Sequence, residues 1–491
     1  MLKPFKKLHF IGIGGIGMSG LAGILLSQGA TISGSDLKHN RLTQELQAQG
    51  ATIYTAHSAE QVPADADYVV VSTAISEHNP EYIAAQTHRI PIIHRSAVLA
   101  HLLAKSRGIS ITGTHGKTTT SALMSLILYD QGLDPTIVIG GEVPQLGTNA
   151  RAGQGAFTVA EVDESDQSLR QLSSEMVLIT NLEVDHLDHY KGLDEIIEAV
   201  MEFLNNQPPA ARIFVNLDDA GVQALLAALP EHKRAQCISF ALKHPDADYR
   251  LSAPPELLTR GSRFSIAYQG QSLGNFEIGI PGLHNIANAL GALACSHYLG
   301  LDLNQLAQTL KAYQGVKRRF QHIGDLPGGV SVIDDYGHHP SEIKATLTTA
   351  RLQQRPVTAV FQPHRYSRTA ALLHDFAASF EQADRIILTD IYAASENPAD
   401  FVIDIHDLVS QTRALNPDKT VLYFPDLECI SQYLLANLHE QELILTIGAG
   451  NITELSGLLL AGKPAAPNSK TEQENNIVYA PIQRGPQRQV V

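Results

Sequence analysis

Cysteine is scarce in this sequence, with three residues among 491, and these lie far apart at Cys237, Cys295 and Cys429. None of them belongs to a C-x-x-C pair, so the sequence offers neither a disulfide framework nor the usual spacing of zinc ligands. This pattern is typical of a protein from a reducing compartment, and we interpret each cysteine as a small buried apolar side chain.

Positive charge is also in short supply, because 36 lysines and arginines face 50 aspartates and glutamates, for a formal net charge of −14. Binding to nucleic acid or to an anionic membrane surface requires a basic face, so we expect neither partner. There is no run of about 18 apolar residues that could span a bilayer. The apolar stretch after the first seven residues is broken by glycines, unlike a signal peptide. We expect a cytoplasmic enzyme that is a monomer or a weak homodimer.

Short apolar strands alternate with helical patterns along three successive segments of the chain. This rhythm predicts an α/β protein of three consecutive α/β domains, with helices covering mostly parallel sheets. We place a Rossmann-like domain at residues 1–106, a P-loop-type ATPase domain at 107–320 and a second Rossmann-like domain at 321–462. An alternating stretch that turns at residues 269–272 predicts an antiparallel hairpin at the edge of the central sheet. Residues 463–491 are rich in proline, glutamine and asparagine and are interpreted as a disordered tail.

The first of two glycine-rich loops has Gly12, Gly14 and Gly17 in G-x-G-x-x-G spacing after a predicted strand. Such a loop lets backbone N–H groups and a helix N-terminus approach a diphosphate. Asp36 ends the second predicted strand, at about the spacing of a ribose contact in dinucleotide-binding proteins. This region alone is therefore compatible with an NAD-dependent oxidoreductase or with another diphosphate ligand.

The second glycine-rich loop, GTHGKTTT at residues 113–120, also joins a predicted strand to a predicted helix. Gly113 and Gly116 flank a tight turn, and Lys117 is placed for the β- and γ-phosphates of ATP. The hydroxyl group of Thr118 is placed for Mg²⁺. The G-x-x-G-K-T spacing is shorter than the general phosphate-loop motif, but G-K-T-T between a strand and a helix still predicts an ATP site.

Two acidic clusters follow later strands of the same segment. The first contains Glu161, Asp163, Glu164 and Asp166, and the second contains Glu183, Asp185, His186 and Asp188. In open α/β sheets, ligands bind beyond the carboxyl ends of the strands, where the second glycine loop also lies. Carboxylate and imidazole groups suit Mg²⁺ or Mn²⁺ held between protein and phosphates.

The last segment gathers histidines and arginines in two loops, DDYGHHPSE at residues 334–342 and FQPHRYSRT at 361–369. An amino-acid substrate brings a carboxylate, which arginine binds through bidentate hydrogen bonds. It also brings an amine that must attack in its neutral form, and a neutral histidine or a carboxylate can accept the amine proton. The two loops therefore favour binding of a small amino acid.

Six ordered motifs of this chain together resemble the Mur ligase family: GTHGKTTT, AEVDESD, NLEVDHLDHY, GLHNIANALGA, DDYGHHP and FQPHRYSRT. The resemblance covers nearly the whole chain apart from the tail. It implies a UDP-substrate domain, an ATPase domain and a domain that helps to bind the amino acid. Within the family, the chain looks most like the branch whose substrates are UDP-N-acetylmuramate and L-alanine. That branch uses ATP and Mg²⁺ (or Mn²⁺) and forms an amide through an acyl phosphate, early in peptidoglycan precursor synthesis.

The resemblance also implies residue roles. The implied catalytic residues are Lys117, Glu161, His186 and His338. The implied ATP-binding residues are Gly113, Thr114, His115, Gly116, Lys117, Thr118, Thr119, Asn285 and Arg319. The implied metal ligands are Thr118 and Glu161 for one ion and His186 for a second. The implied amino-acid-binding residues are Tyr336, His338, Arg365 and Arg368. The first glycine loop then becomes the UDP-substrate site, with Gly14, Gly15, Ile16, Gly17, Asp36, Ser72 and Thr73 as its residues.

Three other interpretations stay open at this point. A ligase that attaches a recycled murein tripeptide to the same UDP-sugar shares most of these motifs. An NAD-dependent oxidoreductase would account for the first loop but leaves Lys117 and both acidic clusters without a role. A nucleotide-gated binding protein without turnover fits the two loops, although the histidines and arginines of the last segment argue against it. Residues 193–207 contain no lysine, whereas family members that add later amino acids carry a carbamylated lysine on the corresponding helix. This departure favours the alanine-adding branch.

Overall fold

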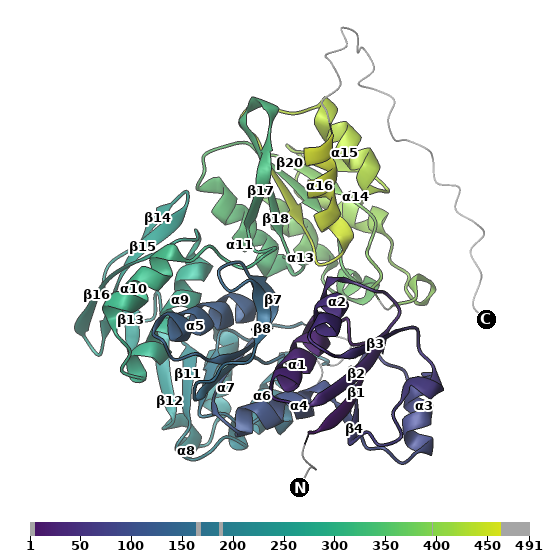
Figure 1. Cartoon of the computed structure of the whole chain (residues 1–491). Coiled ribbons are helices and arrows are strands. Elements are labelled where there is room, and N and C mark those ends of the chain that lie inside the picture. The colour runs from purple at the N-terminus through teal and green to yellow at the C-terminus, as the bar shows by residue number, and fades with distance from the viewer. Residues whose placement is uncertain (1–4, 164–167, 186–189, 395, 463–491) are drawn as a thin grey trace, which may run out of the picture.

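The computed structural model describes residues 5–163, 168–185, 190–394 and 396–462, and these form three β-sheets with helices packed on them (Figure 1). The sheets take their strands from residues 7–94, 107–278 and 321–447 in turn. We call each sheet with its helices the N-terminal, the central and the C-terminal part. The predicted α/β class with mostly parallel sheets is confirmed. The predicted tail, residues 463–491, lies outside the described residues.

The N-terminal part is a parallel five-stranded sheet with the strand order β3-β2-β1-β4-β5. Its strands are β1 (Lys7–Ile11), β2 (Thr31–Asp36), β3 (Thr52–Thr55), β4 (Tyr68–Val71) and β5 (Ile92–His94). Its helices are α1 (Ile16–Ser27), α2 (Arg41–Ala48), α3 (Pro80–Thr87) and α4 (Arg95–Ala104). The apolar side chains of the central strand β1 are buried, as expected where helices cover both faces of a parallel sheet. This is the Rossmann-like order, and it places ligands beyond the carboxyl end of β1.

The central part is an eleven-stranded sheet with the order β14-β15-β13-β12-β11-β10-β6-β9-β7-β8, and β16 pairs with β15. Its first strands are β6 (Arg107–Thr112), β7 (Thr136–Val143), β8 (Thr148–Arg151), β9 (Phe157–Glu161) and β10 (Met176–Ile179). The others are β11 (Arg212–Asn216), β12 (Cys237–Ala241), β13 (Tyr249–Leu251), β14 (Glu256–Leu258), β15 (Gly261–Tyr268) and β16 (Gln271–Ile278). The predicted edge hairpin is β15–β16, which is antiparallel.

Two buried helices cover the middle of the central sheet, α5 (Lys117–Asp130) and α9 (Leu283–Tyr298). The others are α6 (Leu193–Asn205), α7 (Ala220–Ala228), α8 (Glu231–Arg234) and α10 (Leu303–Ala312). Strand β6 lies between β9 and β10, in parallel register with both. The second glycine loop therefore emerges between the chain segments that follow Glu161 and Ile179, which carry the two acidic clusters.

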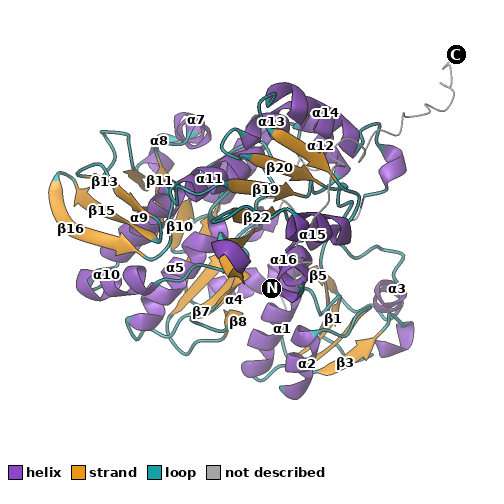
Figure 2. Cartoon of the chain, turned by 90° about the horizontal axis from the view of Figure 1, so that it is seen from above, coloured by secondary structure: helices purple, strands orange, loops and turns teal. Residues whose placement is uncertain are grey.

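The C-terminal part is a six-stranded sheet with the order β17-β18-β22-β19-β20-β21, parallel except for β17 at its edge. Its strands are β17 (Gln321–Leu326), β18 (Val330–Asp335), β19 (Val357–Phe361), β20 (Arg385–Leu388), β21 (Thr420–Tyr423) and β22 (Leu443–Ile447). Its helices are α11 (Pro340–Arg351), α12 (Tyr366–Ala371), α13 (Leu373–Ala377), α14 (Ile405–Leu415), α15 (Leu427–Ala436) and α16 (Glu454–Ala461). Figure 2 shows α11 on the side of the C-terminal part that faces the central part.

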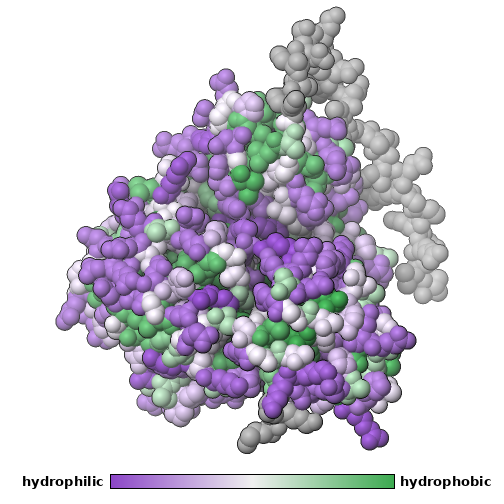
Figure 3. All heavy atoms as spheres, in the orientation of Figure 1, coloured by the Kyte–Doolittle hydropathy of each residue, from purple (hydrophilic) through white to green (hydrophobic). Residues whose placement is uncertain are grey.

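The surface shown in Figure 3 is dominated by polar side chains, with apolar patches separated from one another. The zone where the C-terminal part meets the other two is mainly hydrophilic on this face. Among the described residues, no helix combines the length and the apolar character needed to cross a membrane.

Candidate active site

The second glycine loop has the backbone geometry that its glycines allow. Gly113 has φ 122° and Gly116 has φ 82°, a region that residues with a Cβ rarely adopt. The segment after β10 holds the loop from the other side: Asn181 Oδ1 accepts from the N–H of His115 at 2.8 Å, and Thr180 Oγ1 donates to the His115 carbonyl at 2.6 Å. The loop is thus fixed at the N-terminus of α5, where free N–H groups attract anions.

Lys117 is the first residue of α5, and its side chain folds back over the loop. Its Nζ donates to the carbonyl oxygens of Gly113 at 2.7 Å and Thr114 at 3.2 Å, and it lies 3.9 Å from Asp163 Oδ1. An ammonium group in this position stands beside the helix N-terminus, where it can turn to a bound phosphate. This is the location expected for a phosphate-binding lysine.

A cavity of about 520 Å³ opens next to this loop, between the central part and α11 of the C-terminal part. Six of the predicted ATP-binding residues line it: His115, Gly116, Thr118, Thr119, Asn285 and Arg319. Gly113, Thr114 and Lys117 lie behind this lining, on the loop itself. Apolar and acidic side chains complete the wall, among them Phe240, Ile280, Asp219 and Glu342. The cavity brings a phosphate loop and a partly apolar pocket together, as binding of a nucleotide requires.

The predicted metal ligands Thr118 and Glu161 lie side by side near this cavity. Thr118 Oγ1 donates to Glu161 Oε1 at 3.0 Å, and the N–H of Gly140 donates to Glu161 Oε2 at 2.7 Å. One oxygen ligand from the first turn of α5 and one from the end of β9, next to a phosphate loop, fit the preference of Mg²⁺ or Mn²⁺ for oxygen ligands. The third predicted ligand, His186, lies outside the described residues, as do Glu164, Asp166 and Asp188.

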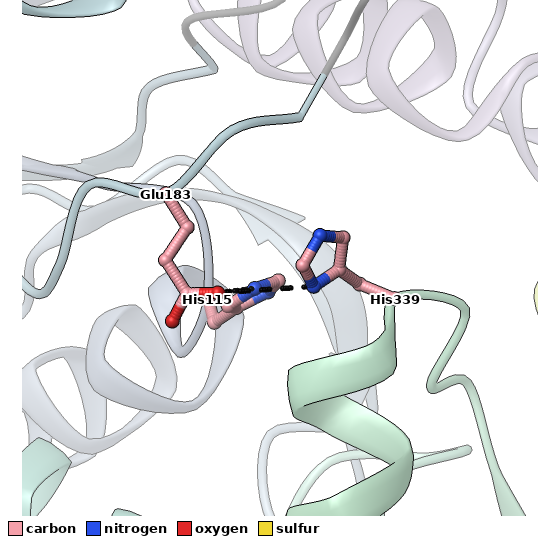
Figure 4. Close-up of side chains that lie close together, drawn as sticks. All are labelled: His115, Glu183 and His339. Atoms are coloured by element: carbon pink, nitrogen blue, oxygen red, sulfur yellow. Dashed lines mark ion pairs between the residues drawn. The ribbon is translucent and has the colours of Figure 1, made fainter. Parts of the chain in front are cut away.

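Residues from the central and C-terminal parts form one polar cluster at the edge of the cavity (Figure 4). His115 Nε2 lies 3.6 Å from Glu183 Oε2, and its Nδ1 lies 3.4 Å from Glu342 Oε1. His339, the residue before α11, has its Nδ1 3.8 Å from Glu183 Oε2 and its Nε2 3.2 Å from the Val184 carbonyl oxygen. Ser341 also donates to Glu183. The cluster therefore joins the phosphate loop to the start of α11.

The carboxylates of this cluster control the charge of His115. Burial alone lowers the pKa of His115, but the nearby carboxylates of Glu183 and Glu342 outweigh it and raise the pKa to about 9. The nearby imidazole of His115 in turn lowers the pKa of Glu183 to about 2, against the effect of burial. Side-chain ligand atoms of His115, Glu183 and His339 all lie within 4.8 Å of one another, which is close enough to hold a metal ion. A protonated imidazole between two carboxylates accounts for this geometry without one.

The predicted amino-acid residues gather beyond the carboxyl ends of β18 and β19. The rings of Tyr336 and His338 lie 5.4 Å apart, and His338 lies 6.1 Å from His364, which stacks on Tyr392. Arg365 precedes α12 with φ 73°, and its N–H donates to the Tyr392 carbonyl at 2.8 Å. These side chains form a second cluster of aromatic and imidazole rings beside the first.

Both histidines of this second cluster are held in the neutral form. Burial lowers the pKa of His338 to about 4 and that of His364 to about 3, and nearby arginines contribute to both shifts. A neutral imidazole is a proton acceptor at neutral pH. Arg368 is predicted to bind the carboxylate of the amino-acid substrate. Its side chain is buried, and its guanidinium contacts Asp185 Oδ1 at 2.9 Å. This ion pair joins the central and C-terminal parts.

The first glycine loop has a different partner. The N–H of Gly14 donates to Asp36 Oδ2 at 2.9 Å, and Asn40 Nδ2 donates to the Gly14 carbonyl at 3.1 Å. A Cβ on Gly12 would lie 3.3 Å from Ile75 Cδ1, so the loop after β4 that carries Ser72 and Thr73 approaches it.

The predicted residue Ile16 lies within this loop, between Gly15 and Gly17. Ile16 begins α1 and is partly exposed, with 46% of its surface accessible. Arg95 Nη1 would lie 3.5 Å from a Cβ on Gly17, which brings a cation to the same place. The structure therefore collects the predicted UDP-substrate residues around one loop.

Sequence reasoning missed several residues of the cavity, above all Glu342, Asn288 and His284. Glu342 forms a capping box with His339 at the start of α11, and the spacing of an acid three residues after a helix N-cap is a signal that could have identified it. A Cβ on Gly116 would collide with the side-chain amide of Asn288, which shows how closely α9 approaches the loop. Neither this approach nor the place of His284 in the cavity wall has a local sequence signal.

The three parts match three family models in order. These are the Mur ligase family catalytic domain over residues 7–107, the Mur ligase middle domain over 111–296 and the Mur ligase glutamate ligase domain over 318–450. The UDP-N-acetylmuramate–L-alanine ligase of Pelotomaculum thermopropionicum is 43% identical to the chain, over 91% of this chain and 95% of that protein. The enzyme of the same name from Gloeobacter violaceus is 44% identical, over 92% of this chain and 95% of its own length.

The fold comparisons agree with these matches. The crystal structure of the UDP-N-acetylmuramate-alanine ligase of Thermotoga maritima superposes with a TM-score of 0.77 at 28% identity, covering 92% of this chain and 98% of that one. A murein peptide ligase from Psychrobacter arcticus has the same fold, with a TM-score of 0.68 at 21% identity over 93% of this chain and 98% of its own.

Proposed function

The chain belongs to the Mur ligase family, and on that premise we propose that it joins L-alanine to the carboxylate of UDP-N-acetylmuramate with consumption of ATP. This reaction is an early step of peptidoglycan precursor synthesis, and we place it in the cytoplasm, in a protein that is a monomer or a weak homodimer. Relatives at 43% and 44% identity over nine-tenths of the chain carry the name of this activity. Neither a tripeptide ligase nor an NAD-dependent oxidoreductase is favoured by these matches.

The observation that carries the proposal is the cavity between the second glycine loop and α11. His115, Gly116, Thr118 and Thr119 of this loop line the cavity together with Arg319, and a helix N-terminus with a guanidinium group suits a nucleoside triphosphate. The neutral histidines of the C-terminal part lie in the loops next to this wall, where an amine would have to be deprotonated. The mechanism of an NAD-dependent oxidoreductase requires neither a site for a triphosphate nor a base for an attacking amine.

The chemistry that joins these pieces is activation of a carboxylate. The γ-phosphoryl group of ATP passes to the carboxylate of UDP-N-acetylmuramate, which becomes an acyl phosphate, and ADP leaves. Lys117 stabilises the charge on the transferring group. Thr118 and Glu161 would hold Mg²⁺, which, when bound, neutralises charge on the phosphates. His186 is the candidate for a second ion.

Amide formation completes the reaction. The amine of alanine loses a proton and attacks the acyl carbon, a tetrahedral intermediate forms, and inorganic phosphate departs. His338 is the candidate to accept that proton, because burial keeps its imidazole neutral and the Glu342 carboxylate, 3.4 Å from its Nδ1, favours the protonated ring. Arg365 and Tyr336 would bind the alanine carboxylate and orient the amine. Arg368 would act with them from its ion pair with Asp185, which ties the amino-acid site to the central part.

The experiment that tests this function is a measurement of phosphate release from ATP with UDP-N-acetylmuramate and a panel of amino acids. We expect release to require both the UDP-sugar and an amino acid, and to be fastest with L-alanine. Replacing the amino acid by the murein tripeptide L-alanyl-γ-D-glutamyl-meso-diaminopimelate should give little release. Release with the tripeptide but not with alanine would overturn the proposal in favour of a recycling ligase. Release without any UDP-sugar would contradict both ligase readings.

A further inference from the structure

The hairpin of β7 and β8 lies between the N-terminal part and the second glycine loop. Figures 1 and 2 both show it between α1 of the N-terminal part and α5 of the central part. The two strands pair regularly at Ile137 and Val138, but the register shifts before the next pair, Val143 with Thr148. Residues 139–142 therefore bulge out of the ladder, and bulges of this kind re-aim backbone groups.

One end of the bulge holds the carboxylate of Glu161. The N–H of Gly140 donates to Glu161 Oε2 at 2.7 Å, and Thr118 Oγ1 occupies the other oxygen. A Cβ on Gly140 would lie 2.8 Å from Glu161 Oε2, and one on Gly141 would lie 2.6 Å from Val316 Cγ1 and 3.0 Å from Thr118 Cγ2. Gly140 thus allows the strand to approach Glu161, and Gly141 allows it to approach Val316 and Thr118.

The other end of the bulge is attached to the N-terminal part. Glu142 Oε2 accepts from Arg41 Nη2 at 2.9 Å, and its Oε1 accepts from Lys317 Nζ at 2.7 Å. Arg41 begins α2 directly after Asn40, whose amide holds the first glycine loop. Glu142 therefore connects that loop, the central part and the segment that leads to the C-terminal part.

Strand β8 makes a second attachment to the same loop. The buried Asn149 donates from Nδ2 to the carbonyl of Ile16 and to that of Ile139, each at 3.3 Å. Gly20 of α1 packs so closely on Ala150 that a Cβ there would lie 2.6 Å from the alanine methyl carbon. The hairpin and α1 are therefore in contact on both sides of the bulge.

Taking Glu161 as a metal ligand of the proposed ligase, we propose that the N-terminal part positions this carboxylate through the β7–β8 hairpin. Gly140 is a positioning residue that acts on Glu161, and Glu142 and Asn149 are positioning residues that act on Gly140. A continuous series of contacts runs from Gly14 to Thr118 by this route. A change in the position of the UDP-substrate loop is therefore transmitted to the predicted metal ligands Thr118 and Glu161.

The near end of this series is tested with Gly140→Ala. The added Cβ displaces the Glu161 carboxylate, so we expect Mn²⁺·ADP to bind about tenfold to a hundredfold more weakly, measured by calorimetry without turnover. Glu161→Asp draws the carboxylate back by one methylene, so Gly140→Ala should cause little further loss when added to Glu161→Asp. The matched control is Gly457→Ala, where a Cβ meets nothing within 4 Å. Independent, additive losses from the two changes would overturn the positioning role of Gly140.

The far end is tested with Glu142→Ala and Asn149→Ala, neither of which touches Glu161. We expect each to weaken Mn²⁺·ADP binding about fivefold and to raise the Mg²⁺ concentration that half-saturates turnover. The matched control is Glu45→Gln, because Glu45 is the other partner of Arg41, at 2.8 Å, and lies within α2. This control should behave as wild type.

Two outcomes at the far end separate the inference from the proposed function. If Glu142→Ala and Asn149→Ala change only the KM for the UDP-substrate, the hairpin is a docking surface and the inference is wrong. If the wild-type protein releases no phosphate with any substrate, the ligase function fails, but Mn²⁺·ADP binding still decides whether the hairpin positions Glu161.

Discussion

The two glycine loops of this chain look alike in sequence and differ in what surrounds them. Each follows the first strand of a parallel sheet and leads into a helix. In the first loop, a carboxylate of Asp36 occupies the N–H of Gly14, and an amide of Asn40 binds its carbonyl group. In the second loop, the ammonium group of Lys117 lies over the carbonyls of Gly113 and Thr114.

The glycine spacing indicates that a ligand can approach the loop backbone closely. The charged groups around each loop indicate which kind of ligand it binds. A loop paired with a carboxylate suits a ligand whose hydroxyl groups can replace the N–H donor, such as a ribose next to a diphosphate. A loop covered by an ammonium group suits a phosphate with several negative charges. This difference supports the proposal that the first loop binds the UDP-sugar and the second binds ATP.

The largest expected effect comes from removing the cation of the second loop. Lys117→Ala should reduce phosphate release about a thousandfold, because a charge that stabilises the transferring phosphoryl group is lost. Binding of UDP-N-acetylmuramate, measured by calorimetry, should not change, since the first loop lies in another part of the molecule. Lys105→Ala is the control, at the exposed end of α4. Activity above a tenth of wild type in Lys117→Ala would show that the two loops do not differ in this way.

The next effect compares the glycine that precedes the helix in each loop. Gly116 has φ 82°, and a Cβ there would collide with Asn288. Gly116→Ala should therefore lower the free energy of unfolding by about 1–3 kcal/mol. Gly15 has φ −68°, and its Cβ would lie 3.5 Å from the Gly12 carbonyl oxygen, an ordinary contact. Gly15→Ala should change stability by no more than about 0.5 kcal/mol. Denaturant unfolding measures both, and equal losses would contradict the comparison.

A smaller effect should follow from removing the carboxylate of the first loop. Asp36→Ala should raise the KM for UDP-N-acetylmuramate about tenfold to a hundredfold, because a hydrogen bond to a charged group is lost. The KM for ATP should rise less, by no more than about fivefold, because the β7–β8 hairpin connects this loop to the predicted metal ligands. Steady-state kinetics with each substrate varied in turn decide the point. A rise in the KM for ATP alone would contradict the assignment of Asp36 to the UDP-substrate site.

The smallest effect concerns pH and the second loop. The pKa of His115 is raised to about 9 by Glu183 and Glu342, above its ordinary value of 6.5. Stabilisation by the protonated imidazole should be fully present below pH 6.5 and lost as the pH rises through 9. The thermal midpoint of wild type should exceed that of His115→Gln by several degrees at pH 6, and the gap should close by pH 10. His232→Gln, on an exposed helix, is the control. A gap that is constant across this range would sink the prediction.

Much of the fold could be read from the apolar runs, and the reason is local. Strand β10, with the sequence MVLI, is buried along its whole length, and its sequence is continuously apolar. The short β3, with the sequence TIYT, is partly exposed along its length and has no comparable pattern. Strands at sheet edges need only one apolar face, so their periodicity is weaker, and β14 and β17 were not distinguished.

The site was predictable only in part, as Arg368 shows. Its motif suggested a clamp for the alanine carboxylate, whereas the folded chain buries it against Asp185, a residue 183 positions away. His115 lies in a phosphate-loop motif, but the sequence around it gives no signal of the two carboxylates that raise its pKa. Such partners come from different parts of the molecule, and their distance depends on how those parts pack.

The sequence by itself determined the three α/β parts, the two glycine loops and the residue types available for phosphate, metal and amine. These features depend on hydrophobic periodicity and on short motifs, which act over a few residues. Only the tertiary structure decided which charges meet: Asp36 with the first loop, His115 with Glu183 and Glu342, and Glu142 between Arg41 and Lys317. Ion pairs and hydrogen bonds need their atoms within about 4 Å of each other, so they exist only once distant segments have been brought together.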